Sequence, residues 1–192
     1  MMERVMVVGT SCSGKSTLAR RLSDALGSPH VELDALHWGP NWSQCPPDEF
    51  REAVRTRVDG ERWVVDGNYS EVRDIVLSRA TDAVWLNYSF PVVFWRALSR
   101  TSRRVVSGEE IFGGNRETFR TAFLRCDSIP CWVIQTHRRY GRSYRELFST
   151  GAAARTRLTE LRRPREADDL VENARGAVEA AVTAASARRI RT

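Results

Sequence analysis

The chain has 192 residues, a formal net charge of +6 and 42% hydrophobic residues, which is ordinary for one globular domain with a substantial core. It contains no apolar run long enough to predict a membrane span. Its N-terminus lacks a signal-peptide pattern, and its four cysteines form no C-x-x-C pair. We therefore expect a cytoplasmic protein with reduced thiols.

The first predicted elements are a buried strand over 4–8 and a helix over 16–26, joined by a glycine-rich segment. That segment reads Gly9-Thr10-Ser11-Cys12-Ser13-Gly14-Lys15-Ser16-Thr17. It matches G-x-x-x-x-G-K-S, a loop whose backbone N–H groups point at phosphate oxygens. Lys15 is the only lysine beside 29 arginines, and its compact ammonium suits a cradle that a planar guanidinium does not fit. The pattern predicts Lys15 on the β- and γ-phosphates and Ser16 on Mg²⁺.

The rest of the chain alternates between predicted strands and helices. We expect strands near 29–34, 62–67, 82–88 and 156–161, and helices near 48–58, 70–78 and 91–104, two or three short ones before 149, and one from 164 onward. This alternation predicts a parallel sheet covered on both faces. Because ligands bind at the carboxyl ends of parallel strands, Asp34 and Asp66, which end the second and third strands, should lie beside Gly9.

Two segments at this edge leave alternatives open. The aromatic stretch 36–42 forms either a wall of a substrate pocket or a hydrophobic plug on the core. Asn68 and Tyr69 either bind substrate or support the phosphate-binding loop.

Positive charge is concentrated in residues 96–145, which hold eleven arginines and four acidic residues. A basic block of this kind is typical of a nucleic-acid surface or of an arginine-rich lid over polyphosphate. The glycine-rich loop favours the lid.

Three stretches, 5–42, 61–88 and 158–171, resemble the adenylate-kinase-related P-loop kinases, and are most similar to the topology-modulation-protein subgroup. The resemblance implies one α/β domain over 1–192, with a five-stranded parallel sheet in the order 2-3-1-4-5 and helices on both faces. It also implies a substrate-side insertion at about 35–60, an arginine-rich lid at about 103–150, and ATP and Mg²⁺ as cofactors.

The resemblance also assigns roles to single residues. Those implied for nucleotide binding are Gly9, Ser11, Cys12, Ser13, Gly14, Lys15, Ser16, Thr17, Arg138, Arg162 and Pro164. Those implied for the metal are Ser16 and Asp66, and those for catalysis are Lys15, Asp34, Arg96 and Arg100. Asp34 is the base if the acceptor is a hydroxyl, and only orients the acceptor if it is a phosphate. Arg51, Arg55 and Arg57 are candidates to clamp a monophosphate acceptor.

Together these features predict an ATP-dependent phosphotransferase for a small nucleotide, nucleoside or hydroxylated metabolite, acting as a monomer or homodimer. The alternative is a non-catalytic or regulatory ATP-binding protein that contacts nucleic acid through its basic face.

Overall fold

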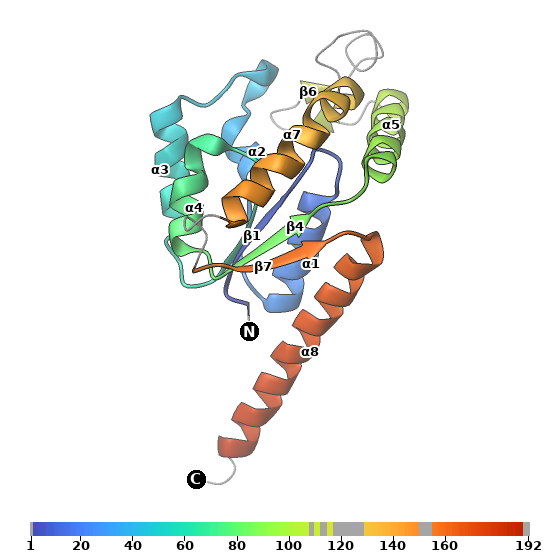
Figure 1. Ribbon diagram of the computed structural model, residues 1–192. Coiled ribbons are helices and arrows are strands. Elements are labelled where there is room, and N and C mark those ends of the chain that lie inside the picture. Colours follow the sequence, from blue (N-terminus) through green and yellow to red (C-terminus); the bar gives the residue numbers. More distant parts are fainter. Residues whose placement is uncertain (1, 108–109, 112–114, 117–128, 150–154, 190–192) are drawn as a thin grey trace.

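The computed structural model describes residues 2–107, 110–111, 115–116, 129–149 and 155–189. Five parallel strands form one sheet in the order β2-β3-β1-β4-β7 (Figure 1). The strands are β1 (Arg4–Gly9), β2 (His30–Glu32), β3 (Trp63–Asp66), β4 (Asp82–Leu86) and β7 (Arg157–Leu161). This confirms the predicted fold class and strand order. A second, antiparallel pair is formed by β5 (Glu110–Ile111) and β6 (Asn115–Arg116).

Helices cover both faces of the sheet (Figure 1). They are α1 (Lys15–Leu26), α2 (Leu33–His37), α3 (Pro47–Arg57), α4 (Arg73–Arg79), α5 (Phe90–Ser107), α7 (Ile129–Ser149) and α8 (Pro164–Arg189), with the 3₁₀ turns η1 (Pro40–Trp42) and η2 (Ser70–Val72). Successive side chains of a strand point to opposite faces, so Val5 and Val7 of β1 pack with α1 and α8, while Met6 and Val8 pack with α3 and α4.

The region before Ser149 differs from its prediction. Within the described residues, 129–149 form one continuous helix, α7, so the expectation of two or three short helices is wrong there. Val133, Thr136 and Tyr144 are buried at helical spacing along it. Gly141 lies inside the helix, because the cost of one glycine is about 1 kcal/mol and the buried face offsets it.

The second strand is shorter than predicted. It ends at Glu32, and Asp34 lies in the first turn of α2 instead of at the strand end. Pairing of β2 with β3 stops at Glu32 opposite Asp66, because Gly67 turns the third strand away with φ of +146°.

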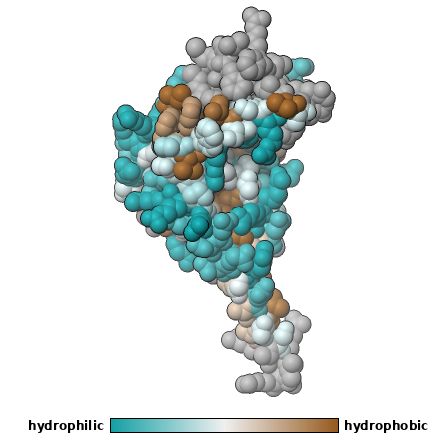
Figure 2. Space-filling model, turned by 90° about the vertical axis from the view of Figure 1, so that its right-hand side faces the viewer, coloured by the Kyte–Doolittle hydropathy of each residue, from teal (hydrophilic) through white to brown (hydrophobic). Residues whose placement is uncertain are grey.

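Part of the expected lid at about 103–150, namely residues 108–109, 112–114, 117–128 and 150, lies outside the described residues. Figure 2 shows apolar side chains gathered on the upper part of one face, with a mostly hydrophilic surface below. The exposed large apolar residues of α5 and α7 include Phe90, Trp95, Val106, Trp132 and Ile134. Among the described residues, no helix has the length and hydropathy needed to cross a bilayer.

Candidate active site

The loop between β1 and α1, residues 9–15, is called the phosphate loop below. Gly9 has φ of +153°, and a Cβ there would lie 2.8 Å from the carbonyl oxygen of Leu86. Gly14 has φ of +98°, and Cys12 also takes a left-handed conformation. The Ser13 N–H donates to the Thr10 carbonyl at 3.1 Å. The chain therefore curls tightly before α1, as a loop must if its N–H groups are to surround a phosphate.

Lys15 begins α1 at the end of this loop, and no described carboxylate lies within ion-pair distance of its ammonium. Its Nζ donates to the carbonyl oxygen of Thr10 at 3.2 Å. Burial lowers the pKa of Lys15 below its usual range, while the charges of Asp34 and then Asp66 oppose this shift. A partly desolvated ammonium of this kind gains strongly from an incoming phosphate.

Asp66 connects three elements at the carboxyl edge of the sheet. Its carboxyl group is 2% exposed, and its Oδ2 accepts a 2.6 Å hydrogen bond from the Ser16 hydroxyl in the first turn of α1. Its Oδ1 lies 2.8 Å from Nε2 of His30 on β2. Glu32 lies on the same face of β2, where burial and then the charge of Asp66 raise its pKa.

These oxygens fit Mg²⁺, which prefers carboxylate and hydroxyl oxygens and keeps waters and phosphates as its other ligands. A hydroxyl that donates its hydrogen to Asp66 still has lone pairs for a cation. The described residues hold no group of three or more His, Cys, Asp or Glu side chains that would bind a metal alone.

Two cavities flank the phosphate loop. The first, of about 470 Å³, lies between α1, α5 and the start of α8, and includes Arg21, Trp95 and Pro164 in its lining. The second, of about 570 Å³, lies towards α2, η2 and α7, and includes Lys15, Asp34 and Tyr69. Both cavities are lined by Cys12, Gly14, Thr17 and Arg100. Molecules in the two cavities would therefore meet at the phosphate loop.

Residues predicted for the site fall into three groups. Ser11, Lys15, Ser16 and Asp34 line the second cavity, Ser13, Arg96 and Pro164 line the first, and Arg100 lines both. Gly9 begins the phosphate loop and Asp66 ends β3, and neither lines either of the two cavities. Arg138 and Arg162 line neither cavity.

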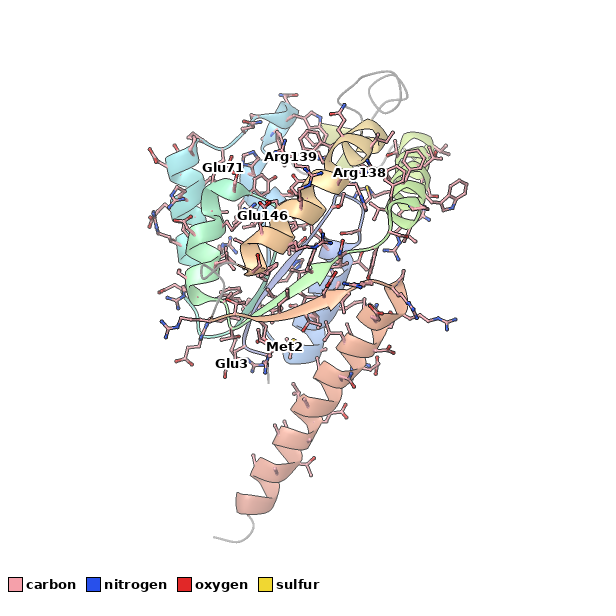
Figure 3. All side chains as sticks on the ribbon, in the orientation of Figure 1. Met2, Glu3, Glu71, Arg138, Arg139 and Glu146 are labelled. Atoms are coloured by element: carbon pink, nitrogen blue, oxygen red, sulfur yellow. The ribbon has the colours of Figure 1, made fainter. Side chains whose placement is uncertain are left out.

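Arg96 and Arg162 already have partners. Arg96 donates to the carbonyl oxygen of Ser13 at 2.7 Å and lies over the ring of Tyr88, so it supports the phosphate loop. The exposed Arg162 bonds to Glu160 at 3.1 Å. Arg138 and Arg139 project from α7 at the upper part of the molecule (Figure 3).

Asn68 and Tyr69 both have partners within the protein, and both also line the second cavity. The Asn68 amide donates to the carbonyl oxygen of Gly9 at 2.7 Å, and its oxygen accepts from the Tyr144 hydroxyl on α7 at 2.7 Å. Asn68 therefore supports the loop. The Tyr69 hydroxyl donates to Asp34 Oδ1 at 2.7 Å and so fixes that carboxylate.

Within the aromatic stretch, one ring packs on the core and the next lines a cavity. The ring of His37 packs against Phe50 and Tyr69, with centroids 5.0 and 4.5 Å away, and forms the plug. The next residue, Trp38, lines the second cavity. Sequence reasoning missed His30 and Glu32, because their closeness to Asp66 depends on the pairing of β2 with β3.

Comparison with solved structures shows the fold of small P-loop kinases. The chain is similar to a gluconokinase from Sinorhizobium meliloti 1021, with 19% identity, a TM-score of 0.51 and 97% of each chain covered. It is also similar to a shikimate kinase from Bacteroides thetaiotaomicron, with 16% identity, a TM-score of 0.53, and 93% of this chain and 99% of that one covered. No family model and no curated protein sequence matches the chain.

Proposed function

We propose that the protein is an ATP-dependent phosphotransferase that binds ATP in the first cavity and a small acceptor in the second. The observation that carries the proposal is the meeting of the two cavities at the phosphate loop, where Gly14 and Arg100 line both. The fold shared with small-molecule kinases supports it. We further infer a single catalytic domain over residues 1–192, and the sequence resemblance favours the topology-modulation subgroup.

The chain's own residues supply positioning and charge, which are the main needs of phosphoryl transfer. Backbone N–H groups of the phosphate loop and the Lys15 ammonium hold the phosphates. Arg100 faces both cavities and stabilises charge on the group in transit. Ser16 and Asp66 would hold Mg²⁺, whose chemistry there is to neutralise phosphate charge.

Asp34 acts on the acceptor. Tyr69 occupies one carboxylate oxygen, so the other is free to take a proton from an acceptor hydroxyl. The acceptor oxygen forms a bond to the γ-phosphorus, the bond to the β–γ bridging oxygen breaks, and ADP leaves. The proton resides on Asp34 until solvent removes it.

The test is incubation with γ-labelled ATP, Mg²⁺ and a panel of nucleosides, nucleotides and hydroxylated metabolites, with Lys15→Met as the inactive control. A labelled product that requires Lys15 supports the proposal. If instead no compound is labelled and the protein shows salt-sensitive binding to single-stranded DNA or RNA, the nucleic-acid-binding alternative replaces it.

A further inference from the structure

The second cavity has an acceptor side that faces away from the phosphate loop. Its lining there consists of two carboxylates, four aromatic rings and two smaller polar residues: Asp34, Glu71, Trp38, Tyr69, Trp132, Tyr140, Asn68 and Ser70. None of these described lining residues is basic. Its two basic lining residues, Lys15 and Arg100, lie at the phosphate-loop end, where the triphosphate needs them.

Two of the three arginines that were candidates to clamp an anionic acceptor are used elsewhere, and the third, Arg57, is exposed and does not line the second cavity. Arg51 makes two hydrogen bonds to the Asp74 carboxylate, at 3.0 and 2.7 Å, and also donates to the main-chain oxygen of Glu71. Arg55 pairs with Glu52 at 3.2 Å on the surface of α3. Both line a separate surface depression and not the second cavity.

The arginines of α7 nearest this wall do not replace them. Arg138 and Arg139 are exposed and line neither of the two cavities. Figure 3 shows them on α7, with Glu71 on the neighbouring η2 side of the same end of the molecule.

Carboxylates and aromatic rings select against anions. A phosphate or carboxylate on the acceptor would lie beside Asp34 and Glu71, and none of the described residues that line this side offers it a cation. An ammonium group gains instead from a carboxylate and from the faces of Trp and Tyr rings. The apolar face of a sugar or base ring packs on the same aromatic side chains.

We propose that the acceptor is a hydroxylated ring compound without any anionic group, and that an amine on the ring increases its affinity. Trp38, Trp132 and Tyr140 hold the ring, Asp34 receives the hydroxyl and Glu71 faces the amine. The proposal rests on the proposed function, since it defines what that function acts on.

The test measures binding and transfer for matched compounds on three ring scaffolds. The hexoses are glucosamine, glucose, glucuronate and glucose 6-phosphate; the others are uridine with its monophosphate, and myo-inositol with its monophosphate. Binding is followed calorimetrically in the presence of a non-hydrolysable ATP analogue and Mg²⁺. For any ring scaffold that binds, we expect the neutral compound to bind at least about tenfold more tightly than its anionic counterpart. Among the hexoses, we expect glucosamine to bind about threefold more tightly than glucose.

A charge-reversal variant makes the test independent of which scaffold binds best. Glu71→Arg should remove the penalty on glucuronate and the advantage of glucosamine, so that their order reverses. Glu52→Arg, on the exposed surface of α3, is the matched control and should change neither. A purely structural effect of Glu71→Arg would weaken all compounds alike, and that result would contradict the proposal.

Failure of this proposal is distinguishable from failure of the proposed function. Transfer to anionic compounds alone would overturn the acceptor class and leave the phosphotransferase in place. Absence of ATP-analogue binding would overturn both. Analogue binding without binding or transfer for any neutral or cationic compound would overturn the acceptor class.

Discussion

The Ser16 hydroxyl donates a 2.6 Å hydrogen bond to Oδ2 of Asp66, and this contact joins the first turn of α1 to the end of β3. The other carboxylate oxygen lies 2.8 Å from His30 Nε2. Asp66 is thereby fixed between two elements before any ligand binds. Asp34, by contrast, is fixed by Tyr69 and lines the second cavity. Neutralising Asp66 and neutralising Asp34 should therefore have different effects on the protein's activity.

Replacing each carboxylate by its amide tests this division. Asp66→Asn should weaken Mg²⁺-dependent ATP binding by about tenfold or more, because a charge-assisted contact is lost. Asp34→Asn should leave ATP binding within about twofold and lower turnover by roughly a hundredfold, the usual contribution of a general base. Calorimetry with and without Mg²⁺, together with turnover of the identified acceptor, separates the two. Equal losses of ATP affinity in both variants would contradict the assignment.

Glu32 gives a prediction about stability and pH. Its pKa is raised above the ordinary value of 4.5 in the folded protein, first by burial and then by Asp66. The folded state therefore binds the proton more tightly than the unfolded state, and stability falls as pH rises from 4.5 through the raised pKa. Glu32→Gln has no carboxyl group at this position and so removes this fall. Without a bound ligand, the variant should therefore be more stable than the wild type at pH 7, and it should lose this advantage below pH 4.

The measurement is the difference in melting temperature between wild type and Glu32→Gln across pH. The same comparison is then made in the presence of Mg²⁺-ATP. Because the wild-type carboxylate helps to attract the cation, the ligand should stabilise the wild type more than the variant and so reduce the difference in melting temperature. A variant less stable than the wild type at neutral pH would mean that attraction between the Glu32 carboxylate and the charge of His30 outweighs the effect of burial.

Lys15 should matter for binding and not for folding. Its ammonium is held by one carbonyl oxygen, and burial lowers its pKa, so its charge stabilises the free protein little. Lys15→Met should lower ATP affinity at least about tenfold, the effect of losing a charged hydrogen bond, while the melting temperature stays the same or rises. Lys15→Arg is the control for charge alone, and should not restore binding if the compact ammonium is required. A large loss of stability in Lys15→Met would show a structural role instead.

Most of the fold could be predicted from local patterns in the sequence. The apolar runs that became β1, β3 and β4, and the glycine-rich segment before α1, are each readable within a dozen residues. His30 and Glu32 were missed because their closeness to Asp66 depends on the register of β2 with β3, in which Glu32 lies opposite Asp66. Such register is set by non-local pairing that a pattern of charges along one strand does not reveal.

The partners of the arginine side chains could not be predicted from the sequence. The resemblance implied a catalytic role for Arg96 and Arg100 and a nucleotide-binding role for Arg162. In the structure, Arg96 bonds to the phosphate loop, Arg162 turns to Glu160, and Arg100 faces both cavities. Each guanidinium lies at the end of a long flexible chain, so its direction depends on carboxylates and carbonyls contributed by other segments.

Arg96 and Arg100, one turn apart on α5, should therefore separate stability from turnover. Arg96→Met removes a 2.7 Å hydrogen bond to Ser13 and should cost about 1–2 kcal/mol, or a few degrees in melting temperature. Arg100→Met should leave the melting temperature unchanged, because Arg100 is exposed, and should lower turnover by roughly a hundredfold. Thermal unfolding and steady-state kinetics on both variants measure this. A stability loss at Arg100 with normal turnover would reverse the assignment.

Two exposed tryptophans provide a paired test of which cavity holds which molecule. Trp95, on α5, is 68% exposed and lines the first cavity, whereas Trp132, on α7, is 39% exposed and lines the second. If the first cavity receives the base of ATP, Trp95→Ala should weaken ATP-analogue binding by about fivefold, equivalent to about 1 kcal/mol of aromatic stacking. Trp132→Ala should leave that affinity unchanged and raise KM for the acceptor by a similar factor. Calorimetry for the analogue and initial-rate kinetics for the acceptor give both numbers from the same preparations. Because each variant is the control for the other, the opposite pattern would mean that ATP and acceptor exchange cavities.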